Sequence, residues 1–471
     1  MLENDFNSPD FGEIMELIQQ YEEAVKANST LNFSEEDFEK IIVFYQDNHE
    51  FKKAMTVANS ALEFFPFSAE FLIKKAEVFA EQNHLDEALD FIGYAETFDP
   101  SDVRIPLTRA DILLFKGMHD AALAEIERGF ELAQTNEDRC ELYLEKADVH
   151  EDKEQYSEVI SALQNALKNE PQNEEALNRL WYAYEITERF DESIIFHHAQ
   201  IEKTPYSHLA WFNLGHAFAG KQNWEKAQDA FEFVIAIKED FDAGYICIAD
   251  VKFMKEEYAE ALDFYLEAIR LSKPQKELYL KTGECFDKLN DTPKARLYTR
   301  KAIAADPHYA EAFYLLGEIY KKEENWQQAI SAYERAVKFN KENIDYLLGL
   351  ADAYLQVEEL DRAVALFEQI LDSDSKFKGH WINLAAAYFE MQDYEAAFAL
   401  LKEAELKFEG EADILYIKAA LYYKAGNKHE AILSLEKALM LNFDLHQVIF
   451  DLFEELADDP VLLQIIEQYR D

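Results

Sequence analysis

The sequence predicts an all-α protein built as an α-α superhelix, and three observations predict it. Alanine recurs at a constant spacing of 34 residues from Ala227 to Ala431. Small residues also occupy two other phases of the same period, twelve positions before and seven positions after these sites. The chain has only 13 Gly and 10 Pro in 471 residues, too few for a loop-rich protein. A fixed period of this length is typical of stacked helix pairs.

The first 34 residues are predicted to form an N-terminal capping helix. Apolar side chains at helical spacing stand among Glu and Gln, at Phe11, Ile14, Met15, Ile18, Tyr21 and Val25. The end units of a stacked array need a polar outer face, which favours a cap over the alternative of a helix that docks on a partner.

Residues 35–445 are predicted to form about twelve helix-turn-helix repeats in one domain. The sites that share one phase are Ala54, Ala88, Ala122, Val159, Ser193, Ala227, Ala261, Ala295, Ala329, Ala363, Ala397 and Ala431. Small residues at three fixed phases indicate that the two helices of a repeat cross closely. Large residues at a complementary phase, such as Tyr45 and Tyr320, are expected in the core.

The repeats resemble the tetratricopeptide repeat, whose pattern is a large residue, Leu-Gly, Tyr, Ala, an aromatic residue and Pro. The sixth unit carries this pattern at Trp211, Leu214, Gly215, Phe218, Ala227 and Phe231. The ninth carries it at Phe313, Leu316, Gly317, Tyr320, Ala329, Tyr333 and Ala336. The resemblance implies a right-handed solenoid whose first helices line a concave groove, and it specifies a fold without specifying a function.

One interval breaks the period. Ala122 and Val159 are 37 residues apart, so three extra residues lie between units three and four. The polar segment 133–139 is the predicted position of the insertion, and we expect it to lengthen the loop because three residues fall short of a helical turn.

The last segment, 446–471, is predicted to form C-terminal capping helices. One apolar stripe consists of Val448, Ile449, Leu452, Phe453 and Leu456. Another follows Pro460 and consists of Val461, Leu462, Ile465, Ile466 and Tyr469. Both have helical spacing.

Charge and segment composition limit the functional classes. The formal net charge is −48, which repels nucleic-acid phosphates and anionic membrane surfaces, so neither is expected as a partner. The sequence shows neither a secretory signal nor a membrane span, which predicts a cytoplasmic protein. Cys140, Cys247 and Cys285 lack metal-site or disulfide spacing and are expected to be small buried residues.

The resemblance implies that positions 2, 5, 9 and 12 of each repeat face the groove. Position 5 is mostly apolar, as at Ile73 and Leu107, and positions 2 and 9 are mostly acidic, as at Glu77 and Asp111. We therefore expect an apolar floor facing open space between acidic flanks, suited to a basic amphipathic protein segment. The side chains expected to contact it are Leu209, Phe212, His216, Ile246, Asp250, Phe253, Leu280, Glu284, Tyr314, Glu318, Leu348, Asp352, Ile382, Phe389, Tyr416 and Tyr423.

No motif points to chemistry. The sequence lacks a nucleophile elbow, a phosphate-binding glycine loop and a zinc-protease motif, so no catalytic residue, metal ligand or cofactor is predicted. The neighbouring His197 and His198 point about 100° apart on a helix, which disfavours a shared metal. The sequence thus predicts a non-enzymatic scaffold, and the alternative is a structural oligomer whose groove or caps are filled by another copy.

Overall fold

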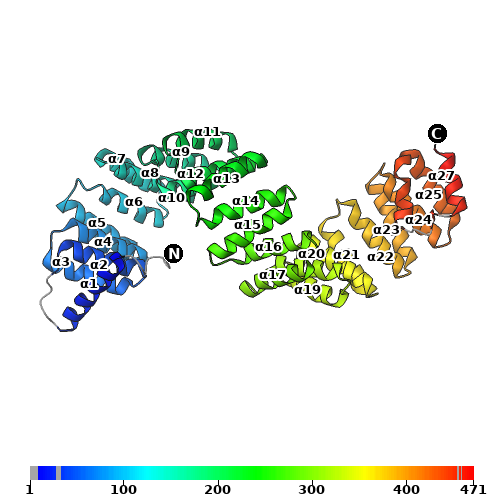
Figure 1. Cartoon of the computed structure of the whole chain (residues 1–471), viewed down its shortest axis with the longest axis horizontal. Coiled ribbons are helices and arrows are strands. Elements are labelled where there is room, and N and C mark those ends of the chain that lie inside the picture. Colours follow the sequence, from blue (N-terminus) through cyan, green and yellow to red (C-terminus); the bar gives the residue numbers. More distant parts are fainter. Residues whose placement is uncertain (1–8, 28–32, 453–455, 458, 471) are drawn as a thin grey trace. The chain divides into compact units, whose positions relative to one another are not determined.

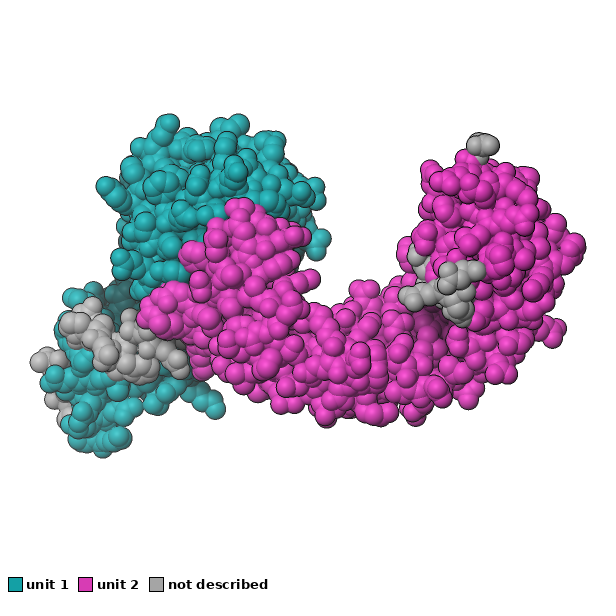
Figure 2. Space-filling view, turned by 45° about the vertical axis from the view of Figure 1, so that its right-hand side comes forward, with its two compact units in different colours: residues 1–251 teal, residues 252–471 magenta. Residues whose placement is uncertain are grey.

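The computed structural model describes residues 9–27, 33–452, 456–457 and 459–470. Within these ranges every regular element is a helix and no strand occurs, so the predicted all-α fold is confirmed (Figure 1). The chain divides into two compact units, an N-terminal unit of residues 1–251 and a C-terminal unit of residues 252–471 (Figure 2). None of the described helices is long and apolar enough to cross a membrane.

The helices alternate between two roles that follow the 34-residue period. The first helices of the pairs are α2 (Glu35–Asp47), α4 (Ala69–Glu81), α6 (Arg104–Phe115), α8 (Asn136–Asp152), α10 (Glu174–Ile186), α12 (His208–Gly220), α14 (Asp242–Met254), α16 (Lys276–Lys288), α18 (Ala310–Lys322), α20 (Ile344–Gln356), α22 (Lys378–Glu390) and α24 (Ala412–Lys424). The second helices are α3 (Phe51–Phe64), α5 (Leu85–Phe98), α7 (His119–Leu132), α9 (Tyr156–Asn169), α11 (Phe190–Lys203), α13 (Trp224–Ile237), α15 (Tyr258–Leu271), α17 (Thr292–Ala305), α19 (Trp326–Phe339), α21 (Leu360–Ser373), α23 (Tyr394–Lys407) and α25 (Lys428–Leu441).

Small side chains allow the two helices of a pair to approach. Ala329 of α19 is fully buried in the same cluster as Leu316 of α18. A Cβ atom added to Gly317 would lie 2.4 Å from the Tyr333 ring, and one added to Gly215 would lie 2.5 Å from the ring of Phe231. The glycine of the Leu-Gly pattern therefore makes room for the aromatic ring of the following helix.

The turn inside each pair uses a left-handed residue that is rarely glycine. Asn83 has φ +62°, and its N–H donates to Ala80 O while the N–H of His84 donates to Phe79 O. These two bonds form the Schellman pattern that ends a helix. The residues with positive φ recur at the repeat period, as His49, Asn83, Gly117, Glu154, Glu188, Gln222, Glu256, Asn290, Glu324, Glu358, Gln392 and Gly426.

The pair α10/α11 departs from this packing. Trp181 of α10 stands where most first helices carry a small residue, and α10 packs on α9 and α12 more extensively than on α11. Polar residues enter the core here, because Ser193, His197 and Gln200 of α11 are all buried. The bulky Trp181 ring of this pair packs on Phe212 and His216 of α12.

The position of the three extra residues corrects the sequence-based expectation. The segment between α7 and α8 has only three residues, whereas the other connections between pairs, such as 65–68, have four or more. Helix α8 has 17 residues where α10 has 13. The three inserted residues and one loop residue together add about one helical turn, so the insertion extends α8 without rotating its packed face. The predicted longer loop is wrong.

Helices at both ends pack on the outermost pairs. Ile18 and Tyr21 of α1 (Pro9–Lys26) are buried against Phe38 of α2, and Tyr21 Oη donates to Ser60 Oγ over 3.2 Å. At the other end lie the 3-10 helix η2 (Phe443–Gln447), α26 (Val448–Leu452) and α27 (Pro460–Gln468). Leu462 and Ile466 of α27 join the cluster of α24 and α25. The Phe11 side chain and residue Phe453, which belong to the predicted stripes, lie outside the described parts.

Candidate functional site on the first helices

The first helices form the inner side of each unit. In the N-terminal unit α4 contacts α6, α6 contacts α8 and α10 contacts α12, and in the C-terminal unit α16 contacts α18, α18 contacts α20 and α22 contacts α24. Successive second helices have no contacts of this extent in the described part. Elements on the inside of a bend are closer together, so the first helices lie on its concave side. We call this surface the inner face of a unit. Figure 2 shows a hollowed side on the C-terminal unit.

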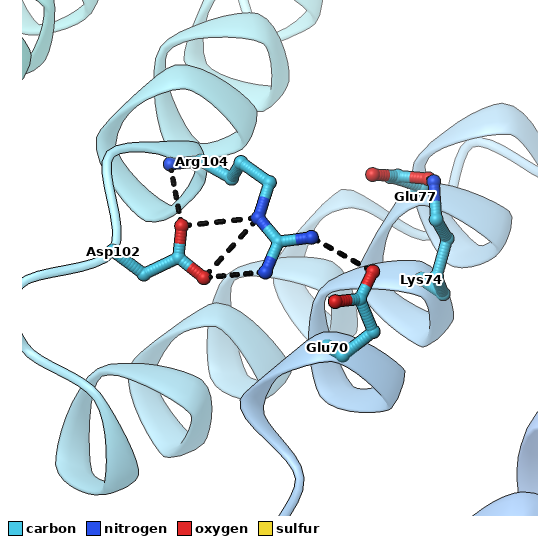
Figure 3. A network of polar contacts seen from close by, with 5 residues as sticks. All are labelled: Glu70, Lys74, Glu77, Asp102 and Arg104. Atoms are coloured by element: carbon cyan, nitrogen blue, oxygen red, sulfur yellow. Dashed lines mark hydrogen bonds and ion pairs between the residues drawn. The ribbon is translucent and has the colours of Figure 1, made fainter. Parts of the chain in front are cut away.

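At one edge of the N-terminal inner face, acids and bases neutralise one another. Arg104 of α6 donates through Nη1 to Glu70 Oε1 over 2.7 Å and through Nη2 to Asp102 Oδ2 over 2.7 Å (Figure 3). Lys74 Nζ lies 3.1 Å from Glu77 Oε2. Arg104, the one basic residue at position 2, therefore links α6 to the preceding first helix, α4.

Further along the same face, carboxylates outnumber cations. Asp111 of α6 and Asp148 of α8 lie close enough to Glu145 of α8 to raise its pKa, and Asp148 also raises the pKa of Asp111. The nearby cation is Arg179 of α10, which donates to Asp148 over 2.5 Å and to Glu151 over 2.9 Å. Glu145 Oε1 is buried and has no hydrogen-bond partner in the described part of the chain. We call Asp111, Glu145 and Asp148 the acidic cluster.

The pKa values of all three carboxyl groups in the acidic cluster are raised above their ordinary values. Burial raises the pKa of Glu145 to about 8, and the charges of Asp111 and Asp148 add to this rise. Burial also raises the pKa of Asp111 to about 6, assisted by Asp148 and Glu77. The pKa of Asp148 is raised by burial too, although Arg179 opposes the change. A cation placed here would relieve both the repulsion and the unmet hydrogen bonding.

The predicted anchors of the N-terminal unit are more buried than expected. Leu209 and Phe212 of α12 are buried, and Phe212 makes edge contacts with Trp181, Phe231 and Phe241. Helix α10, helix α13 and the loop before α14 thus cover the Phe212 side chain at position 5. The expectation that this side chain faces open space is wrong, and Leu209 at position 2 is buried as well.

A second group of predicted residues surrounds Phe212. His216 is partly accessible, stacks on Trp181 with ring centroids 4.6 Å apart, and lies 3.6 Å from the sulfur of Cys247. Burial lowers the pKa of His216 to about 4, so the ring is neutral at physiological pH. Ile246 and Asp250 of α14 are half-buried.

In the C-terminal unit, α18 and α20 bring together predicted site residues and aromatic rings that were not predicted. Tyr314 is half-buried, and its ring stacks on Tyr346 at 4.9 Å. Tyr333 Oη donates to Glu318 Oε1 over 2.5 Å, and Asp352 pairs with Lys321 over 3.5 Å. Burial raises the pKa of Tyr314 to about 12, and Glu318, Asp345 and Asp352 add to this rise.

The other predicted residues of the C-terminal unit differ in exposure. Phe253, Glu284, Leu348, Ile382 and Tyr423 are half-buried. Leu280 and Phe389 are buried, so the expectation that these two side chains face open space is also wrong.

Tyr416 was expected to contact a partner in the groove, but it is not accessible there. Its side chain is fully buried and donates to Asn442 O over 2.9 Å, within the cluster that contains Ile449 and Phe450. The segment that follows α25 therefore covers the inner side of α24 at this point. Tyr423, two helical turns further along α24, donates through Oη to Asp459 Oδ2 over 2.6 Å.

The candidate site contains residues that the sequence pattern missed. Glu145 and Arg179 stand at position 6, next to the position that was expected to form the floor, and Tyr346 lies outside the four inward positions. A search for acids at position 6 would have found Glu145. Among the described residues, no three His, Cys, Asp or Glu side chains are arranged to hold a metal ion.

Comparisons with known proteins agree with the repeat architecture. Four models of the tetratricopeptide repeat match residues 280–344, 320–388, 382–404 and 412–445. Anaphase-promoting complex subunit 3 of Schizosaccharomyces pombe is 23% identical over 168 residues, which are 36% of this chain and 25% of that relative. The TPR repeat-containing protein YpiA of Bacillus subtilis is 20% identical over 318 residues, 65% of this chain and 74% of that protein.

A solved structure is also similar. The crystal structure of the APC/C hetero-tetramer Cut9-Hcn1 aligns over 93% of this chain and 97% of its own chain, with 12% identity and a TM-score of 0.41. The match to the Schizosaccharomyces pombe relative spans only a quarter of that protein's length.

Proposed function

Because this chain is a tetratricopeptide-repeat protein, we propose that it is a non-enzymatic scaffold that binds basic, amphipathic segments of other proteins on its inner faces. Repeats of this kind hold a partner by surface complementarity, and their fold alone does not identify the partner. The side chains on those faces therefore determine the chemical nature of the partner.

The acidic cluster is the observation that carries the proposal. Arg179 pairs with Asp148 and also with Glu151 and Glu175, and Glu145 Oε1 lacks a hydrogen-bond partner among the described residues. A lysine or arginine of a bound segment would supply the missing cation. Burying a carboxylate that stays unpaired costs free energy, so binding would recover part of that cost.

The C-terminal unit supports the amphipathic part of the proposal. Tyr314 and Tyr346 form a stacked aromatic pair beside the acids Glu318 and Asp352. Large aromatic side chains at the centre of an interface commonly carry much of the binding energy. An apolar side chain or a cation would find a partner on this surface.

A defined peptide tests this function. The probe is a capped two-heptad peptide of Lys and Leu with its leucines on one helical face, and its control has Gln in place of Lys. We expect the Lys peptide to bind and the Gln peptide to bind much more weakly in isothermal titration calorimetry. Equal binding of the two peptides would refute the basic partner.

A matched pair of variants tests the aromatic contact. Tyr314→Ala should weaken the binding of the Lys peptide to the C-terminal unit by about 2 kcal/mol. Tyr206→Ala, which removes a side chain that is 85% exposed, should leave it unchanged. If both variants bind the peptide like the unmodified chain, the aromatic pair is not part of the site.

The alternative function is that of a structural oligomer. The exposed apolar residues Met440 and Leu441 at the end of α25 favour this alternative, because an end surface can stack on another copy. Sedimentation equilibrium at several concentrations separates the two functions, because the scaffold stays monomeric without its partner.

A further inference from the structure

The C-terminal unit has a basic surface on helix α17 and the adjoining part of α19, opposite in sign to the chain as a whole. Helix α17 carries Lys294, Arg296, Arg300 and Lys301 and no Asp or Glu, within a protein of net charge −48. The next second helix, α19, carries Arg335 and Lys338 and one acid, Glu334. This surface is separate from the inner face that the proposed function uses.

A pocket lies in this basic surface. It has a volume of about 340 Å³ and lies between α17 and α19. Ile303, Phe313 and Leu316 provide apolar contacts, while Arg300 and Arg335 stand on the two helices beside it. Gln328 and Ser331 of α19 also line it, and both side chains can donate hydrogen bonds.

The two pocket arginines differ from neighbouring arginines in their partners. Arg296 pairs with Glu323 over 2.8 Å, and Arg362 pairs with Glu359 over 3.0 Å. Arg300 instead donates to the hydroxyl of Tyr320 over 2.8 Å, and the Arg335 guanidinium lies 5.4 Å from the centre of the Phe313 ring. Neither forms an ion pair with a carboxylate of the described residues.

We propose that this pocket binds an acidic side chain of a protein partner, with the carboxylate between Arg300 and Arg335 and an adjacent apolar side chain against Phe313 and Leu316. Guanidinium groups bind carboxylates through paired, charge-assisted hydrogen bonds. The net charge of −48 opposes a dianion more strongly than a single carboxylate. We therefore assign a Glu or Asp side chain rather than a phosphorylated one.

The probe for this site is the acetylated and amidated pentapeptide Gly-Leu-Glu-Phe-Gly, compared with its Gln and phosphoserine counterparts. Saturation-transfer NMR on the intact chain measures binding of each peptide. We expect the Glu peptide to bind, the Gln peptide to bind at least about fivefold more weakly, and the phosphoserine peptide to bind no better than the Glu peptide.

Paired variants locate the binding. The double variant Arg300→Gln with Arg335→Gln should lose binding of the Glu peptide. The control Arg296→Gln with Arg362→Gln removes the same charge from arginines that already have carboxylate partners, and it should retain binding. Thermal unfolding by circular dichroism checks that both double variants are folded.

Four results would overturn the proposal. The first is no detectable binding of the Glu peptide, and the second is equal binding to the first double variant and the unmodified chain. The third is a phosphoserine peptide that binds much more tightly than the Glu peptide. The fourth is self-association of the chain that the first double variant abolishes, because the occupant would then be a second copy. None of these results bears on binding of basic peptides to the inner faces.

Discussion

At the scale of single residues, the inner face of the N-terminal unit stores unfavourable charge. The carboxyl of Glu145 is buried near Asp111 and Asp148, and one of its oxygens finds no hydrogen-bond partner within the ranges that the structure describes. Such a group weakens the folded state unless a proton or a cation reaches it. Residues that reduce stability in this way are commonly found where a protein binds something.

The acidic cluster predicts an unusual pH dependence. The pKa of Glu145 rises from an ordinary value of 4.5 to about 8, and that of Asp111 rises from 3.8 to about 6. Between the ordinary and the raised pKa values of these two groups, the folded state binds more protons than the unfolded state. The free energy of unfolding therefore falls as the pH rises through this range. We expect the N-terminal unit to melt at a lower temperature at pH 8 than at pH 6, at constant ionic strength.

The variant Glu145→Gln assigns this effect to one side chain. It should raise the melting temperature at pH 8, measured by circular dichroism, and reduce the difference between pH 6 and pH 8. Glu131→Gln, on an exposed residue of α7, should change neither quantity. A Glu145→Gln variant with the same pH dependence as the unmodified chain would contradict the assignment.

The sequence predicted the small buried residues better than it predicted exposure on the inner face. Ala329 and Gly317 are buried at helix crossings, as a constant spacing of small residues indicates. Phe212 is buried partly by Trp181 of the preceding repeat and Phe241 of the loop before α14, and Tyr416 is buried by the segment that follows α25, so no spacing within one repeat reports those contacts. The position of a residue within its repeat determines which way its side chain points, whereas contacts with neighbouring repeats determine how exposed that side chain is.

At the scale of elements, helix α8 shows how the repeat accepts an insertion. Its first turn is closed by a capping box in which the Asp138 N–H donates to Thr135 Oγ1 over 3.0 Å and the Thr135 N–H donates to Asp138 Oδ2 over 2.9 Å. Sequence spacing located the extra residues correctly but predicted a loop. The capping box and the loop shortened by one residue make a full extra turn favourable.

The capping box gives a prediction for α8. Thr135→Ala should lower the free energy of unfolding by about 1 kcal/mol, measured by urea denaturation, and should speed amide hydrogen exchange in the first turn of α8. Ser68→Ala is the matched control, because Ser68 is the N-cap of α4 and makes no side-chain capping bond. Equal effects of the two substitutions would show that the capping box does not hold the added turn.

At the scale of the whole molecule, both compact units are built from the same kind of helix pair. Most first helices have a side that faces their neighbours and a side that carries acids, although α12 has no Asp or Glu, and the acids are compensated in some places and not in others. The net charge of −48 attracts cations over long distances, which speeds association without selecting a site. Local carboxylates must therefore be separated experimentally from the overall charge.

The most direct test of the central claim compares two triple variants of equal charge. One neutralises the acidic cluster as Asp111→Asn, Glu145→Gln and Asp148→Asn. The other neutralises exposed acids of the second helices as Glu131→Gln, Glu158→Gln and Asp229→Asn. At pH 9, where Glu145 with its pKa of about 8 is also ionised, both lose the same number of negative charges, so their long-range attraction for a cationic peptide is equal.

The measurement is the affinity of the Lys and Leu peptide for the N-terminal unit of each full-length variant, by isothermal titration calorimetry. If the inner face binds basic segments, the cluster variant should lose at least about tenfold in affinity, and the second-helix variant should match the unmodified chain. Equal affinity of the two variants would mean that the acidic cluster attracts no partner and that the claim is wrong.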